Sequence, residues 1–108
     1  MAMEMLREPL IQTIDIIMPG RLGFHLRVVA RFVKRVREFR SSIRVRKGKV
    51  FADGKSMLGL LILGAAWKSK LEIEAVGDDA VQAIESIKEF FLKENISDNQ
   101  PKRDFLAN

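Results

Sequence analysis

The stretch of residues 23–39, GFHLRVVARFVKRVREF, decides how this chain folds, because a strand pattern ends just before it and a helix pattern begins inside it. Apolar side chains fall at positions 26, 29, 32, 33, 36 and 39, which is the spacing of one helix face. His25 stands at the start of this predicted helix, where backbone N–H groups lack intrahelical partners and the helix dipole is positive. Such a position favours a phosphate or another anion, and Arg27 adds a planar cation beside it.

The rest of the chain predicts four strands and two further helices around this segment. Strands are indicated by β-branched or alternating side chains, and a turn at Lys47-Gly48-Lys49 joins two of them. Ser56 is placed as the N-cap of a short apolar helix, and the final helix is amphipathic. The predicted strands are 10–18, 43–46, 50–52 and 70–76, and the predicted helices are 26–39, 57–63 and 80–93.

This order of elements favours one α+β domain, in which an antiparallel sheet carries its helices on one face. We expect a leader over residues 1–9, the domain over 10–93 and a flexible C-terminal tail over 94–108. A chain of 108 residues with 47% hydrophobic residues is large enough for a single core without a covalent staple.

The composition excludes several kinds of chemistry. The chain has no cysteine and one histidine, so it predicts no disulfide, no thiolate metal site, no cysteine nucleophile and no metal or cofactor. No apolar run approaches the roughly 18 residues of a membrane span, and the first residues lack the pattern of a signal peptide. We therefore expect a cytoplasmic protein.

The net charge of +5 is unevenly distributed along the chain. Acidic residues dominate between Glu72 and Asp98, whereas between Arg21 and Lys49 Glu38 is the only acidic residue. The basic residues of that second region are Arg21, Arg27, Arg31, Lys34, Arg35, Arg37, Arg40, Arg44, Arg46, Lys47 and Lys49. A basic half of this kind steers towards an acidic protein surface, a phosphorylated group or nucleic acid, or is simply a solvated face.

Two motifs resemble a known family when they are read together. The run Gly23-Phe24-His25-Leu26-Arg27 resembles the active-site loop of the histidine-containing phosphocarrier HPr of the bacterial sugar phosphotransferase system. The run GKSMLGLLILGA, residues 54–65, resembles the regulatory serine segment of that family, and the separation of His25 and Ser56 also matches. The resemblance covers about residues 10–93.

The resemblance implies an open-faced β-sandwich, with a four-stranded antiparallel sheet and three helices on one face. It implies that His25 accepts a phosphoryl group on Nδ1 from phosphorylated enzyme I and passes it to a downstream acceptor such as an enzyme IIA domain. Arg27 would neutralise the charge of the phosphoryl group, and Ser56 would be a regulatory site for an HPr kinase/phosphorylase. The protein would then be a carrier rather than an enzyme.

The short helix is apolar on more sides than a core requires, so part of it is predicted to form a docking surface. If Leu60 and Leu63 face inward, the other side of the helix must be largely exposed. The residues expected at partner contacts are Phe24, Arg31, Lys34, Lys55, Met57, Leu58 and Leu61. In the family motif proline usually follows the arginine, whereas this chain has Val28, whose backbone is less pre-ordered, and this bears on the rate of transfer.

Two other functions stay open at this level. A regulatory or nitrogen-branch paralogue of the same family would use the same chemistry for signalling. A basic nucleic-acid-binding module would explain the charge, but the predicted basic helix lacks interleaved exposed aromatic side chains and the chain carries no nucleic-acid motif. An enzyme is disfavoured, because no acid–base pair with His25 is recognisable.

Overall fold

The computed structural model describes residues 10–20, 23–66 and 68–99, and it contains four strands and three helices. Side chains are described as far as Glu94. The leader expected over residues 1–9 lies outside the described part, as do residues 100–108 of the expected tail. The elements in chain order are β1 (Ile11–Ile17), α2 (Leu26–Val36), β2 (Ser42–Lys47), β3 (Val50–Asp53), α3 (Met57–Leu63), β4 (Lys70–Val76) and α4 (Ala80–Asn99).

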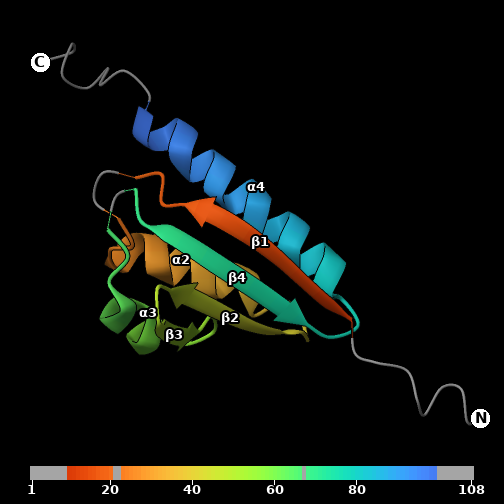
Figure 1. Ribbon diagram of the computed structural model, residues 1–108. Coiled ribbons are helices and arrows are strands. Elements are labelled where there is room, and N and C mark those ends of the chain that lie inside the picture. The colour runs from red at the N-terminus through yellow and green to blue at the C-terminus, as the bar shows by residue number, and fades with distance from the viewer. Residues whose placement is uncertain (1–9, 21–22, 67, 100–108) are drawn as a thin grey trace, which may run out of the picture.

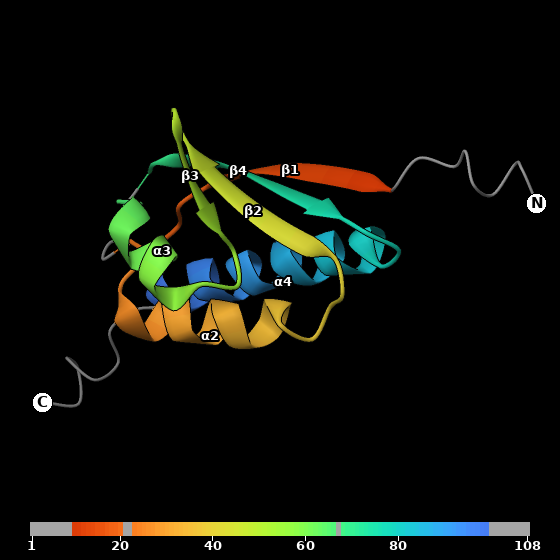
Figure 2. The same cartoon turned by 90° about the horizontal axis from the view of Figure 1, so that it is seen from below.

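The four strands form one antiparallel sheet in the order β1-β4-β2-β3 (Figure 1). In the register of the sheet, Ile73 of β4 lies opposite Ile14 of β1 on one side and Val45 of β2 on the other. Seen from below, the sheet is one layer and α2 and α4 lie beneath it, with α3 at one end (Figure 2). The predicted architecture, a four-stranded antiparallel sheet with three helices on one face, is confirmed.

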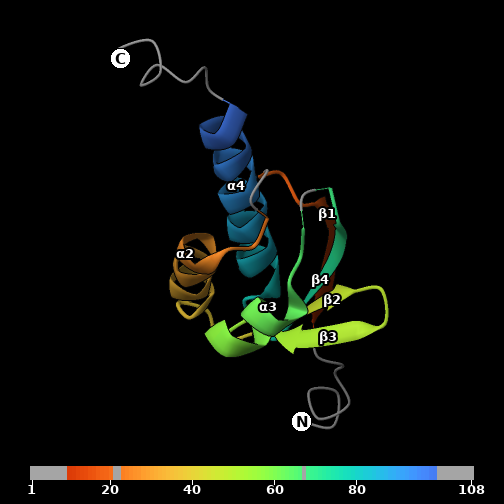
Figure 3. The same ribbon diagram turned by 90° about the vertical axis from the view of Figure 1, so that its left-hand side faces the viewer.

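Alternation along the strands places the core between the sheet and the helices, a separation that the side view shows (Figure 3). Leu71, Ile73 and Ala75 of β4 are buried, and the residues between them are only partly covered. This pattern follows from the period of two in a strand, which sends successive side chains to opposite faces. β1 lies at the edge of the sheet, and its inward Ile14 and Ile16 are less buried than the residues of β4.

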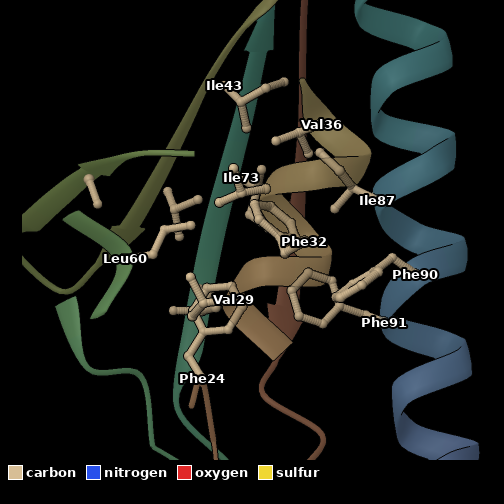
Figure 4. Packing of buried hydrophobic residues seen from close by; sticks show 14 of the residues in the cluster. Phe24, Val29, Phe32, Val36, Ile43, Leu60, Ile73, Ile87, Phe90 and Phe91 are labelled. Carbon is tan, nitrogen blue, oxygen red and sulfur yellow. The ribbon is translucent and has the colours of Figure 1, made fainter. Parts of the chain in front are cut away.

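An aromatic cluster fills the space between α2 and α4 (Figure 4). The ring of Phe32 lies 5.6 Å from that of Phe90 and 5.7 Å from that of Phe91. Phe24, from the loop before α2, joins the cluster at 5.5 Å from Phe32. Phe24–Phe32 and Phe32–Phe90 meet edge to face, which adds to the free energy gained by burying the rings, so the cluster holds α2, α4 and the loop together.

The structure corrects the C-terminal end of the first predicted helix and the burial of its first residue. The helix ends at Val36 rather than at residue 39, and the N–H groups of Glu38 and Phe39 donate to carbonyls three residues earlier. Leu26, assigned by its spacing to the buried face, is 60% exposed. It is the first residue of the helix and lies at the rim of the core, where the apolar spacing no longer dictates burial.

The last helix is longer than predicted. It continues to Asn99 instead of ending at Lys93, so the first part of the expected tail is helical. Glu94, in this added part, is buried and forms an ion pair with Arg31 of α2. A contact between these two residues could not be inferred from periodicity, because the two helices are distant in sequence.

Asp79 connects the loop after α2 to the start of α4. Its carboxylate accepts hydrogen bonds from the Arg40 N–H at 2.8 Å, the Ser41 N–H at 2.9 Å and the Ser41 hydroxyl at 2.5 Å. The Ser41 hydroxyl and the Arg40 N–H lower the pKa of Asp79 below its ordinary value of 3.8. The hydrogen-bonded carboxylate therefore stabilises the fold only while it is ionised.

We predict that Asp79→Asn lowers the stability of the fold at neutral pH. Because the folded pKa lies below the unfolded one, the stabilisation is complete above about pH 4 and is lost as pH falls through the folded value. Urea unfolding of wild type and variant should therefore differ at pH 7 and converge towards pH 2. Asp78→Asn, at the exposed neighbouring position, is the control. An equal loss in both variants at pH 7 would contradict the role of Asp79.

Candidate functional site

His25 is the N-cap residue of α2. Its backbone is extended, with φ −84° and ψ 173°, and its carbonyl accepts the first helical hydrogen bond from the Val29 N–H at 2.9 Å. The N–H groups of Leu26, Arg27 and Val28 therefore precede that first bond and are available to an anion. The imidazole makes no capping hydrogen bond and is partly exposed, so it is free to react with a group that approaches from solvent.

The loop before His25 is fixed against the segment that follows α3. The Phe24 N–H donates to the Ala65 carbonyl at 2.8 Å. Gly23 has φ +67°, and a Cβ added there would lie 2.4 Å from the same carbonyl oxygen. Only glycine satisfies both the left-handed backbone and the close approach. The position of His25 is therefore set by backbone contacts on one side and by the aromatic cluster on the other.

Phe24 does not belong to an exposed docking surface, and this part of the prediction is wrong. Its side chain is 4% exposed and packs between Phe32 and Phe91, with ring centroids 5.5 and 6.1 Å away. Its actual role is to anchor the loop in the core.

Arg27 is exposed on the first turn of α2, two residues after His25. Among the residues that the structure describes, it forms no ion pair. A cation at the N-terminus of a helix is mildly unfavourable, so an anion bound near His25 would remove an existing electrostatic conflict. Val28, at the position where the family motif usually has proline, is buried and contributes its side chain to the core.

The short helix α3 exposes a large part of its apolar surface. Leu60 and Leu63 are buried and Leu58 and Leu61 are exposed, as predicted. Met57 is a correction, because it is only partly exposed and packs against the core. Its packing against the core depends on neighbours in space, which its apolar sequence could not reveal.

Two exposed apolar residues near the site were missed by the sequence analysis. Ile62 is 74% exposed and lies one helical turn after Leu58, so the i, i+4 spacing could have placed it on the same face. Leu26 follows His25 directly, and no sequence signal distinguished it from the buried positions of α2. We define the apolar docking surface as Leu26, Leu58, Leu61 and Ile62.

Ser56 and Lys55 lie at the other end of this surface from His25. The Lys55 ammonium donates to the Phe39 carbonyl, just after α2, at 2.7 Å, whereas the other end of α3 contacts the loop before His25. Lys55 is thus half-buried and engaged with the backbone. The Ser56 hydroxyl accepts a hydrogen bond from the Gly59 N–H at 3.0 Å, which confirms the predicted N-cap.

The fold neutralises part of the basic half of the sequence. Three arginines pair with acidic residues of β4 and α4: Arg31 with Glu94, Arg35 with Glu89 and Arg46 with Glu72. Lys34 is exposed on α2 and, like Arg27, has no ion pair within the described part of the chain. Arg21 lies outside the described residues.

Other kinds of site are not found in the described part of the chain. No group of three or more histidine, aspartate or glutamate side chains comes together there in a way that could hold a metal ion. Among the same residues, no helix is both long and apolar enough to cross a bilayer.

The fold and the site define a class of protein. It is an α+β sandwich that presents a partly exposed histidine at a helix N-terminus, next to an arginine and an exposed apolar helix. The family model described as "PTS HPr component phosphorylation site" matches residues 12–93. The chain belongs to the HPr family of phosphocarrier proteins of the phosphotransferase system.

Individual relatives agree with this assignment. The phosphocarrier protein HPr of Neisseria meningitidis serogroup B is 34% identical over 76 residues, which are 70% of this chain and 83% of that protein. The phosphocarrier protein HPr of Haemophilus influenzae is 38% identical over 65 residues, 60% of this chain and 76% of that protein. The crystal structure of HPr-C-His from Thermoanaerobacter tengcongensis superposes with a TM-score of 0.75 at 27% identity, covering 78% of this chain and 94% of that one.

We predict that Gly23→Ala destabilises the protein and displaces the histidine loop. The left-handed backbone alone costs about 1–2 kcal/mol for a residue with a Cβ, and the Ala65 carbonyl adds a steric clash. Gly48→Ala is the matched control, because Gly48 has φ +60° with no atom within 4 Å of the added Cβ. Denaturant unfolding should show a larger loss at Gly23 than at Gly48. Equal losses would mean that the contact with Ala65 does not hold the loop.

Proposed function

We propose that His25 accepts a phosphoryl group from phosphorylated enzyme I and passes it to a downstream acceptor such as an enzyme IIA domain. The observation that carries the proposal is the place of His25 at the N-cap of α2, with its imidazole uncommitted to the cap and partly exposed. Family membership supports a phosphocarrier, and this geometry supports His25 as the residue that carries the group.

The transfer requires a nucleophile and charge stabilisation rather than acid–base work. The unprotonated nitrogen of a neutral imidazole carries the lone pair that attacks phosphorus. With the ring proton on Nε2, the bond from Nδ1 to phosphorus forms while the bond from phosphorus to the donor breaks. The donor leaves with the electron pair of that bond, and the reverse events pass the group to the acceptor.

Arg27 and the start of α2 would stabilise the phosphoryl oxygens. The N–H groups of the first helical turn and the guanidinium of Arg27 are the donors next to His25. The Arg27 side chain is exposed and remains in contact with water, so it would stabilise the phosphorylated form only moderately. A carrier needs this, because a tightly held phosphoryl group would not be passed on. Val28 keeps a backbone N–H in the first turn, whereas a proline at that position would have none.

The docking surface would serve enzyme I and the acceptor in turn. The apolar residues Leu26, Leu58, Leu61 and Ile62 provide area to be buried. Arg27 and Lys34, which have no ion pair within the described residues, provide positive charge for acidic partners. The protein would act in the cytoplasm as a carrier without catalytic turnover of its own, and it would need no cofactor.

We predict that enzyme I and phosphoenolpyruvate add one acid-labile phosphoryl group to the wild-type protein and none to His25→Ala. The imidazole of His25 is the proposed acceptor, and the variant has no histidine in its place. Intact mass measured before and after mild acid treatment checks the result. Arg27→Gln should still be phosphorylated but roughly tenfold more slowly, because about 1.5 kcal/mol of charge-assisted hydrogen bonding is lost.

A folded wild-type protein that gains no mass from an active enzyme I would contradict the proposed function. Phosphate on the His25→Ala variant would instead contradict the assignment of the acceptor residue. Circular dichroism of each variant serves as the control for folding.

Phosphorylation of Ser56 would regulate the carrier, since a phosphate there would add negative charge to the rim of the docking surface. We predict that Ser56→Ala costs about 1 kcal/mol of stability, because the Gly59 N–H loses its acceptor. Ser56→Asp should keep the cap and the stability, yet slow phosphorylation by enzyme I roughly tenfold at low salt, since it repels an acidic partner. Thermal unfolding and the rate of phosphorylation separate the two effects. A slow Ser56→Ala together with a fast Ser56→Asp would overturn this prediction.

A further inference from the structure

Arg31 differs from the other exposed cations of α2 because it is paired with a buried carboxylate of α4. Arg31 Nη2 lies 2.6 Å from Glu94 Oε2 of α4. The Arg31 side chain is 53% exposed, whereas the Glu94 side chain is 5% exposed. The guanidinium therefore spans the boundary between the interior and solvent, with one edge held from beneath and the rest available outside.

Glu94 depends on Arg31 for its counter-charge. Its Oε2 is buried and makes no hydrogen bond of good geometry with any residue that the structure describes. The ion pair at 2.6 Å is the interaction that compensates this oxygen. An uncompensated carboxylate inside a protein is costly, so the pair keeps the guanidinium of Arg31 in place.

The cleft next to this pair has room for a side chain from a partner. It has a volume of about 270 Å³ and lies between α2 and α4. Its lining is predominantly basic, and its residues are Arg31, Lys34, Arg35, Glu38, Phe90, Lys93 and Glu94. Arg35 is directed towards Ser86 and Glu89 of α4, so the cleft presents Arg31 and Lys34 on the α2 side.

We infer that Glu94 is a positioning residue for partner recognition, which fixes the guanidinium of Arg31 so that it can bind an acidic side chain of a docked partner. The inference rests on the proposed function, since it extends the docking surface across α2 to the edge of α4. Arg27 and Lys34 have no ion pair in the described residues and so act as mobile charges that steer. Arg31 is oriented in advance, so it loses less conformational entropy when a partner binds.

The orientation can be measured without any partner. In the full-length protein, the NMR order parameter of the Arg31 Nε–Hε group should be high in wild type and fall in Glu94→Gln. Glu89→Gln is the matched control, because it removes the same charge from an exposed position of the same helix. Glu89 itself pairs only loosely with Arg35, at 3.4 Å. An order parameter that is equally low in wild type and in Glu94→Gln would overturn the inference.

The effect on recognition is measured as the KM and kcat of enzyme I for the carrier. Glu94→Gln should raise KM about threefold to tenfold, the cost of ordering one long side chain on binding, and leave kcat unchanged. Glu89→Gln also makes the surface more positive but does not release Arg31, so it should leave KM unchanged or lower it. The double variant Arg31→Gln/Glu94→Gln, which leaves no carboxylate unpaired, should have a KM no lower than Glu94→Gln.

The outcomes separate this inference from the function on which it rests. Wild-type protein that enzyme I does not phosphorylate would contradict the proposed function, and the order parameter would then still decide whether Glu94 fixes Arg31. Normal phosphorylation with the same KM for Glu94→Gln and Glu89→Gln would overturn the role in recognition alone. Thermal unfolding of each variant shows whether a change in KM reflects partial unfolding.

Discussion

The burial of Phe24 is the constraint on which the rest of the site depends. Its ring is packed against Phe32 and Phe91, and its N–H is bound to the Ala65 carbonyl. Because Phe24 is in the core and α2 begins at Leu26, His25 is the single residue between the buried side chain and the helix. The position of His25 therefore follows from the packing of α2 against α4. The buried Phe24 thus fixes the place of its partly exposed neighbour His25.

Much of the fold could be predicted from the sequence, because the patterns that determine it are local. The alternation in β4 and the apolar spacing in α2 each indicate which face must be buried. One antiparallel sheet with three helices on one face buries both. The ends of the helices were less predictable. α2 ends at Val36, and a few residues later the backbone N–H groups of Arg40 and Ser41 bind Asp79, which lies about forty residues away in sequence. α4 continues past Lys93, and Glu94 in this added part pairs with Arg31, another contact between segments distant in sequence.

In the candidate site too, local features could be predicted and features that depend on distant segments could not. His25, Arg27 and Ser56 could be selected as candidates from the sequence because each lies at the start of a helix. Phe24 and Met57 could not be assigned correctly, because their burial depends on elements that meet them only in the folded chain. Exposure of a side chain in an apolar helix is a property of its neighbours in space. The period of the helix alone does not contain that information.

Folding also changes the meaning of the charge distribution. The sequence separates a basic half from an acidic half, yet Arg31, Arg35 and Arg46 pair with acidic residues of α4 and β4. Among the described residues, Arg27 and Lys34 of α2 stay exposed and have no ion pair. Mobile surface charges raise the rate of encounter more than they lengthen the life of a complex. A carrier that must leave one partner in order to reach the next is served by that balance, since a larger or more strongly charged interface would delay its release.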